Sequence, residues 1–219
     1  MNKRKLMKAL IAAPVSCLVG SSLANTPSLA PAKEPLNRPF RSVNAAEDGR
    51  RVLFFFDFAC PFCASYHEPL MTFSRTVPQT IQTMFLPIIN VADLARKDEQ
   101  IIAAKVYYAA LSIATRPQIN RFVAYVYRAY PLSRDLKDRS MWRAAIMDSG
   151  IDVPRFTQAF KATASNIQLT NAARKLMQYD VRATPSVGIG GKYVISPDDV
   201  GGDQAMFFNI LNGLTSEIL

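Results

Sequence analysis

The sequence predicts an α/β protein in which an all-helical insertion separates two strand-containing halves. Three observations support this fold class. An apolar run of strand length, residues 51–58, leads directly into a helix-like segment. Residues 93–164 contain few glycines, many alanines and apolar positions spaced three and four apart, as in helices. Two short apolar runs around a Gly190-Gly191 turn then precede a final amphipathic segment, residues 203–219.

The first 24 residues have the layout of a secretory signal peptide. Four basic residues precede an uncharged, mostly apolar stretch at 9–19, and small residues stand at positions 22 and 24. The apolar stretch is too short for a membrane span. Cys17 suggests a lipoprotein as an alternative, but Pro14 stands where a lipid-attachment motif normally has leucine. We therefore expect export and cleavage after residue 24.

The charge of the chain gives no sign of a nucleic-acid partner. Removal of residues 1–24 takes away four positive charges and no negative ones, so the net charge falls from +9 to +5. No block of like charges and no basic stripe interleaved with aromatic residues is present. The basic excess is typical of a solvated surface.

Cysteine usage is the most informative feature of the composition. Because Cys17 leaves with the signal peptide, the mature chain keeps only the pair in Cys60-Pro61-Phe62-Cys63. A disulfide across so short a loop stabilises a fold little. Loose thiols are also a liability in the oxidising compartments that exported proteins enter. The pair is therefore predicted to be reactive.

Residues 25–50 are expected to form an N-terminal extension and a first strand. The strand at 51–58 should be central and buried, because it is apolar throughout. A helix is predicted from Cys60 to about residue 76, followed by a strand at 81–89.

Prolines are expected to divide the region 93–164 into several helices, at Pro117, Pro131 and Pro154. One further helix is predicted at 166–179. Two short strands within 185–195 and a helix over 203–219 complete the chain.

The position of Cys60, between a strand and a helix, suits redox chemistry. Unpaired N–H groups and the positive end of the helix dipole favour a thiolate there, and Pro61 suits the first helical turn. Cys63 lies about one turn further in, where it is expected to be partly covered. A substrate thiolate that meets the exposed sulfur would form a mixed disulfide, which a second thiol resolves.

Metal binding is the competing interpretation of the cysteine pair. Cys60, Cys63 and His67, the only histidine, would supply three ligands. Structural zinc normally takes four, and no second Cys/His pair exists. We therefore expect no metal and no cofactor other than the Cys60–Cys63 disulfide itself. A packing role for His67 is favoured over an auxiliary role in catalysis.

Two motifs extend the argument to a known family. The segments Phe-Phe-Asp-Phe-Ala-Cys-Pro-Phe-Cys at 55–63 and Val-Arg-Ala-Thr-Pro-Ser-Val-Gly-Ile-Gly-Gly-Lys-Tyr at 181–193 are similar to those of the DsbA family of periplasmic disulfide oxidoreductases. The similarity covers roughly residues 51–219. It implies a thioredoxin fold formed by residues 51–92 and 165–219, with 93–164 as the helical insertion.

The resemblance also implies roles for individual residues. Cys60 would be the nucleophile and Cys63 its buried partner, with Pro61 and Phe62 between them. Thr184-Pro185 would form a cis-proline loop opposite the cysteines, able to offer backbone hydrogen bonds to an extended substrate. Without the resemblance, an ordinary trans turn would be the preferred interpretation of Thr184-Pro185.

The chain departs from the family pattern at two positions. Phe62 stands where oxidases of the family often have histidine, so electrostatic help for the Cys60 thiolate is missing there. Phe54 stands where many relatives bury an acid that handles protons for the second cysteine. Asp57 is the nearest acid, but strand alternation puts it on the opposite face from Phe54. We expect Asp57 to hydrogen-bond the turn that enters the helix.

The leading functional hypothesis is a monomeric periplasmic oxidase. It would donate its disulfide to reduced or unfolded exported proteins and be reoxidised by a DsbB-like, quinone-linked membrane oxidase. One alternative is a thiol reductase or isomerase, although residues 25–50 are too few for the dimerisation module that such isomerases usually carry. Another is a non-redox peptide-binding chaperone of a secretion system, which would not require two thiols.

Overall fold

The computed structural model describes residues 38–89, 98–162 and 164–219, so the expected signal peptide lies outside the described residues. The elements in chain order are β1 (Arg41–Ser42), the 3-10 turn η1 (Ala46–Asp48), β2 (Arg51–Phe56), α1 (Pro61–Thr76), β3 (Gln82–Pro87), α2 (Glu99–Leu111), α3 (Arg116–Ser133), α4 (Arg139–Asp148), α5 (Val153–Lys161), α6 (Ala164–Gln178), β4 (Ser186–Ile189), β5 (Tyr193–Ile195), η3 (Pro197–Val200) and α7 (Gln204–Ser216).

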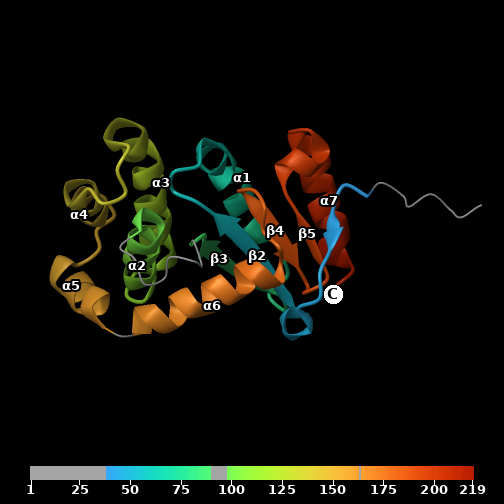
Figure 1. Cartoon of the computed structure of the whole chain (residues 1–219), viewed down its shortest axis with the longest axis horizontal. Coiled ribbons are helices and arrows are strands. Elements are labelled where there is room, and N and C mark those ends of the chain that lie inside the picture. Colours follow the sequence, from blue (N-terminus) through green and yellow to red (C-terminus); the bar gives the residue numbers. More distant parts are fainter. Residues whose placement is uncertain (1–37, 90–97, 163) are drawn as a thin grey trace, which may run out of the picture. The chain divides into compact units, whose positions relative to one another are not determined.

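The five strands of the described residues form one mixed sheet in the order β1-β5-β4-β2-β3. Strand β2 pairs parallel with β3 and antiparallel with β4, and β5 is antiparallel to both β4 and β1. The predicted turn between β4 and β5 contains Gly190 and Gly191 with φ of 60° and 66°, the left-handed region that glycine favours, and the Lys192 N–H closes it on the Ile189 carbonyl at 3.0 Å. The predicted fold class, a strand-and-helix domain with a helical insertion, is confirmed (Figure 1).

Strand β2 is buried on both faces of the sheet. Val52 and Phe54 join a core with apolar residues of α1 and α7. Leu53 and Phe55 join a second core that includes α6 and the helices inserted after β3. Successive side chains of β2 point alternately into these two apolar cores, so the strand is required to be apolar on both faces.

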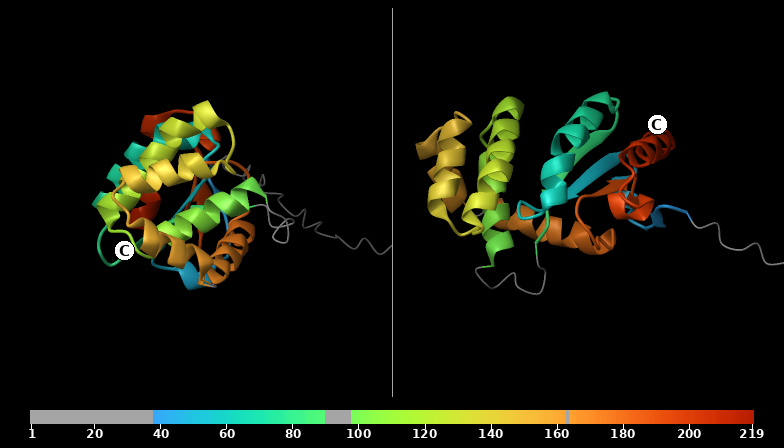
Figure 2. Two further views of the ribbon diagram at one scale, coloured as in Figure 1. Left: turned by 90° about the vertical axis from the view of Figure 1, so that its left-hand side faces the viewer. Right: turned by 90° about the horizontal axis from the view of Figure 1, so that it is seen from above.

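Helices α2–α5 lie together beside the sheet, on the side away from α7 (Figure 2). The side chains of Asp98, Asp138 and Asp152 accept hydrogen bonds from N–H groups of the first turns of α2, α4 and α5. None of the described helices has both the length and the apolar character needed to cross a membrane.

Only two of the three prolines divide the insertion as expected. Pro117 and Pro154 lie in the first turns of α3 and α5. The prediction for Pro131 is wrong, because this residue lies inside α3, which ends at Ser133. A proline inside a helix removes one backbone hydrogen bond. So near the end of a helix whose other face is buried, the fold tolerates the loss of this one bond.

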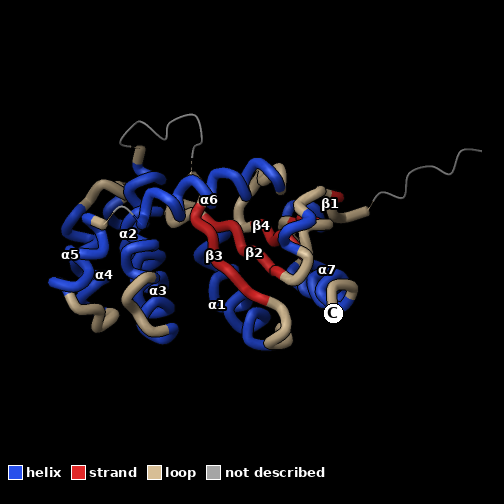
Figure 3. Tube along the Cα trace, turned by 90° about the horizontal axis from the view of Figure 1, so that it is seen from below, coloured by secondary structure: helices blue, strands red, loops and turns tan. Residues whose placement is uncertain are grey.

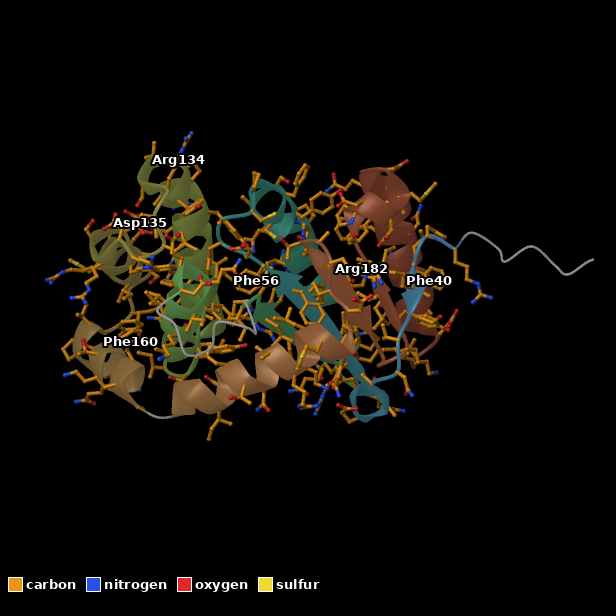
Figure 4. The ribbon with its side chains drawn as sticks, in the orientation of Figure 1. Phe40, Phe56, Arg134, Asp135, Phe160 and Arg182 are labelled. Atoms are coloured by element: carbon orange, nitrogen blue, oxygen red, sulfur yellow. The ribbon has the colours of Figure 1, made fainter. Side chains whose placement is uncertain are left out.

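Phe58 anchors the insertion to the end of β2. Its ring centroid lies between 5.5 and 6.4 Å from those of four insertion residues, Tyr107, Phe122, Tyr127 and Trp142. The neighbouring Phe56 lies where the sheet meets these helices (Figure 4). Edge-to-face and tilted aromatic contacts of this kind contribute beyond the area they bury. The contacts of Phe58 with the inserted helices therefore fix the start of the segment that carries Cys60.

A buried ion pair fixes the N-terminal segment to α6. Asp48 is fully buried, and Lys175 Nζ lies 2.5 Å from its carboxylate, with Arg51 at 2.9 Å. The Tyr179 hydroxyl donates to the same carboxylate at 3.1 Å and accepts from the Gly191 N–H at 3.1 Å. Because a buried charge requires its partners, this network holds the β4–β5 turn, α6 and η1 in one arrangement.

The fixed ring of Tyr179 makes Gly188 sensitive to substitution. A Cβ at Gly188 would lie 2.4 Å from this ring, whose hydroxyl is held at its far end by Asp48 and Gly191. We predict that Gly188→Ala lowers the free energy of unfolding by about 1–3 kcal/mol, measured by urea denaturation. Gly213→Ala in α7 is the control, because its Cβ would meet nothing within 4 Å. It is expected to stabilise the protein by up to about 1 kcal/mol. Equal effects of the two changes would contradict the prediction.

Candidate active site

Cys60 is the N-cap residue of α1. Its φ and ψ of −88° and 116° are extended, and its sulfur accepts a hydrogen bond from the Cys63 N–H at 3.3 Å. Pro61 takes the first helical position, where a missing N–H costs nothing. The sulfur therefore occupies the place at which serine or aspartate usually caps a helix, beside unpaired N–H groups.

Cys63 lies one turn further along α1 and is 2% exposed, whereas Cys60 is only partly buried. The Asp57 N–H points to the Cys63 sulfur at 3.4 Å. Both cysteines are free thiols in this structure. One accessible and one covered sulfur therefore stand next to each other, which is the order that the sequence predicts.

The two thiols differ sharply in acidity. The Cys63 thiol donates a hydrogen bond to the Cys60 sulfur, and this is the main reason that the pKa of Cys60 is lowered to about 6. Hydrogen bonds from the Thr184 side chain and from the N–H groups of Cys63 and Phe62 lower it further, against the opposing effect of burial. The same pairing with Cys60, together with burial, raises the pKa of Cys63. The pair therefore ionises at Cys60.

The Thr184-Pro185 peptide bond is cis and lies beside the cysteines. As a thiol, Cys60 donates to the Thr184 carbonyl oxygen at 3.1 Å. Pro185 is buried and immediately precedes β4. Phe62, on the other side of Cys60 in the chain, is 62% exposed. The accessible sulfur is thus accompanied by a backbone carbonyl and by an exposed aromatic ring.

Asp57 holds the turn between β2 and α1, as expected. One carboxylate oxygen accepts from the Ala59 N–H at 2.9 Å and the other from the Gln100 side chain at 3.0 Å. Burial raises the pKa of this carboxyl group, while these two hydrogen bonds lower it. Gln100 was not predicted. It lies 43 residues from Asp57 on α2, and no local sequence pattern marks it.

His67 packs against the insertion. Its ring centroid lies 5.4 Å from that of Tyr127 on α3, and burial lowers its pKa, which favours the neutral imidazole. Within the described ranges, no group of three Cys, His, Asp or Glu side chains is placed to hold a metal ion.

Phe54 fills the place beneath the site where many relatives have an acid. Its ring stacks on Phe85 at 4.5 Å and meets Phe73 edge-on at 6.2 Å. A carboxylate at this position would have to be desolvated among apolar rings. Asp57, not residue 54, is therefore the acid whose backbone contacts the Cys63 sulfur.

Comparisons with known proteins agree with this geometry. No protein-family model matches the sequence. The thiol:disulfide interchange protein DsbA of Bordetella parapertussis is 25% identical over 209 residues, which cover 90% of this chain and 93% of that protein. A DsbA protein of Burkholderia cepacia is 21% identical over 89% of this chain and 88% of its own.

Solved structures support the same fold. The DsbA of Pseudomonas aeruginosa superposes with a TM-score of 0.67 at 16% identity, over 82% of this chain and 92% of its own. A Proteus mirabilis DsbA with a non-covalently bound peptide, PWATCDS, gives 0.67 at 13% identity, over 84% and 100%. The resemblance to the DsbA family and the thioredoxin fold with a helical insertion, both expected from the sequence, are confirmed.

The hydrogen bond between the sulfurs can be tested by titration. We predict that the alkylation rate of reduced protein by iodoacetamide rises with pH around a midpoint of about 6, from Cys60 alone. Cys63→Ala should raise this midpoint, because it removes the principal donor. Cys63→Ser keeps a hydroxyl donor and should give an intermediate value. An unchanged midpoint in Cys63→Ala would show that the backbone alone stabilises the thiolate.

The same shift makes the stability of the reduced form depend on pH. The native pKa of about 6 lies below the value of about 8.5 for a free thiol. The stabilisation is therefore fully present above the unfolded pKa and is lost as the pH falls through about 6. Relative to Cys60→Ser, the free energy of unfolding of the reduced chain should rise between these two pH values, as measured by urea denaturation at each pH.

Proposed function

We propose that this chain, a DsbA-like disulfide oxidoreductase by its sequence and fold, works in the periplasm as an oxidase that donates a Cys60–Cys63 disulfide to exported proteins. The observation that carries the proposal is the capping position of Cys60, where its sulfur accepts hydrogen bonds while Cys63 stays covered. An oxidase needs its reduced form stabilised relative to its disulfide, and a low-pKa thiolate provides this.

The reaction proceeds in two exchanges. A client thiolate attacks the Cys60 sulfur of the disulfide, the S–S bond breaks, and Cys63 leaves and takes up a proton. A second client thiolate attacks the client sulfur of this mixed disulfide, and Cys60 leaves as a thiolate. The client loses two electrons, which the two cysteines receive. A low pKa at Cys60 favours the second step, because a stable thiolate is the better leaving group.

The Thr184-Pro185 loop is the proposed docking element for the client backbone. The Thr184 carbonyl accepts from the Cys60 thiol in the free, reduced protein. Once Cys60 is bonded to sulfur it has no proton to donate, so the carbonyl is available to an N–H of an extended client. The peptide held by the Proteus mirabilis DsbA structure supports such a use. The exposed ring of Phe62 offers apolar contact next to the same sulfur.

Export and reoxidation complete the proposal. The basic and apolar segments at 1–24 direct the chain to the periplasm. There a DsbB-like, quinone-linked membrane oxidase accepts the two electrons from the reduced pair, with the protein acting as a monomer.

A reductase is the second candidate, because Phe62 supplies no cationic partner for the thiolate. The N-terminal end of a helix stabilises an anion by about 1–2 kcal/mol. Because 1.4 kcal/mol corresponds to about 30 mV for a two-electron couple, the helix end alone shifts the reduction potential of the cysteine pair by only tens of millivolts from a thioredoxin-like value. The hydrogen bonds from Cys63, Thr184 and the backbone to Cys60 are what favours the oxidase.

Trapping of mixed disulfides tests the roles of the two cysteines. Cys63→Ala should accumulate mixed disulfides with exported proteins that already contain a disulfide, because the Cys60 thiolate can attack that bond and displace one client thiolate, while the Cys63 thiol that would resolve the mixed disulfide is absent. Cys60→Ser should accumulate none, because the accessible sulfur is lost. Non-reducing electrophoresis after acid quenching gives the measurement. The reverse pattern would exchange the two roles.

The direction of electron flow is tested by the reduction potential. Equilibration with glutathione should give a value clearly above the thioredoxin value of about −270 mV. Phe62→His should raise it further by adding positive charge near Cys60, whereas Phe62→Leu, which changes no charge, should leave it nearly unchanged. The protein should also restore disulfide formation in cells that lack their main exported oxidase. A thioredoxin-like potential without restoration would assign the protein to the reductases.

A further inference from the structure

A cavity of about 560 Å³ lies along β3 and extends to Cys63 and Pro185 of the redox site, although neither Cys60 nor Thr184 lines it. Its walls come from α1, from the consecutive helices α2 and α3, and from α6. Figure 3 shows β3 between α6 and α1, with no helix drawn across it in that view. We refer to this space as the β3 cavity. Its volume is in the range of sites that hold small molecules.

The β3 cavity is largely apolar but contains one unsatisfied hydroxyl group. Leu70, Met71, Met84 and Val123 belong to its lining. Tyr108 of α2 also lines it, is 4% exposed, and its hydroxyl has no hydrogen-bond partner among the residues that the structure describes. A buried hydroxyl without a hydrogen-bond partner is destabilising, so a hydrogen bond from it to a polar atom of a bound molecule would favour binding.

The charged side chains around the β3 cavity favour an anionic ligand. Four cationic side chains and a single carboxylate line it, namely Arg51, Arg116, Arg174, Lys175 and Asp48. Three of the cations are occupied, because Arg51 and Lys175 pair with Asp48, and Arg174 with Glu47. Arg116 is exposed and makes no ion pair with any described residue. It follows Tyr108 by eight residues, across the corner between α2 and α3.

We propose that the β3 cavity binds a small amphiphilic carboxylate, such as a fatty acid. The apolar body of the ligand lies among the side chains of α1, β3 and α3. Its carboxylate accepts a hydrogen bond from the Tyr108 hydroxyl and is attracted by the Arg116 guanidinium. Both polar groups line the same cavity from the consecutive helices α2 and α3, so the proposed position of the charged end of the ligand is between them.

An extended protein segment fits the same place less well. Strand β3 is the end strand of the sheet and has one free edge, to which a peptide strand could add. The Tyr107 hydroxyl of α2, however, already donates to the Phe85 carbonyl of β3 at 3.4 Å. Strand addition would also leave the buried Tyr108 hydroxyl without a partner.

The test uses dodecanoate with the purified oxidised chain, and dodecanol and dodecyltrimethylammonium as probes of the same apolar length. Calorimetric titration below the micelle concentration should give saturable one-to-one binding of dodecanoate. Binding of the uncharged alcohol should be about tenfold weaker, and that of the cation weaker still. Absence of saturable binding, or equal affinity for the three probes, would overturn the proposal.

Variants locate the site. Tyr108→Phe should weaken dodecanoate binding about tenfold, and Arg116→Gln about threefold because this residue is exposed. Tyr125→Phe and Arg143→Gln, whose side chains are not part of the cavity lining, are the controls and should bind like the parent chain. Binding that is the same in all four variants would place dodecanoate elsewhere. Displacement of dodecanoate by a cysteine-free client peptide would assign the cavity to clients instead.

A stability measurement separates a ligand contact from a structural one. Without ligand, Tyr108→Phe removes a hydroxyl that has no partner, so its urea midpoint should equal or exceed that of the parent chain. With saturating dodecanoate, the parent chain should gain more stability than the variant. A loss of stability in the ligand-free variant would mean that the hydroxyl has a partner within the protein, which would contradict the proposal. Neither readout depends on thiol exchange, so the result is independent of the proposed oxidase activity.

Discussion

The turn between β2 and α1 carries the constraint on which the site depends. Within residues 57–60 the chain must leave a strand that is buried on both faces and start a helix with a reactive side chain as its cap. Asp57 makes this possible, because its carboxylate accepts from Ala59 within the turn and from Gln100 on α2. Its own N–H points to the Cys63 sulfur. One residue therefore fixes the start of the helix, the covered thiol and the insertion relative to each other.

This arrangement explains how the thiolate is stabilised without the charged groups found in many relatives. Phe62 and Phe54 are apolar, so neither can favour ionisation of Cys60 by charge. What remains are hydrogen bonds from Cys63, from Thr184 and from the first N–H groups of α1. These donors follow from the spacing of the two cysteines at a helix start and from the loop opposite them. The low pKa of Cys60 thus depends first on the Cys63 thiol and then on the Thr184 side chain and the backbone N–H groups of α1, and a positive charge at position 62 would lower it further.

The sequence was sufficient where the physical cause is local. The strand-to-helix junction at Cys60, the Gly190-Gly191 turn and the apolar alternation of β2 each depend on neighbours within a few residues. Pro131 was misjudged because a proline in the last turn of a helix removes only one hydrogen bond, and α3 continues to Ser133, where Arg134 in the left-handed conformation caps it. Gln100 and Tyr127 could not be found from the sequence, since their partners Asp57 and His67 lie far away along the chain. The same holds for the pairing of Asp48 with Lys175, which are 127 residues apart.

The helical insertion contributes to both places where chemistry or binding is proposed. Helix α2 carries Gln100 near its start, on the Asp57 carboxylate, and Tyr108 eight residues later, in the β3 cavity. At 1.5 Å per residue these two positions are about 12 Å apart along one helix. The helix is apolar on most of its surface and is buried between the sheet and the other inserted helices. The proposed ligand would therefore contact, at Tyr108, the helix that also holds the redox turn through Gln100, and the cavity itself reaches Cys63.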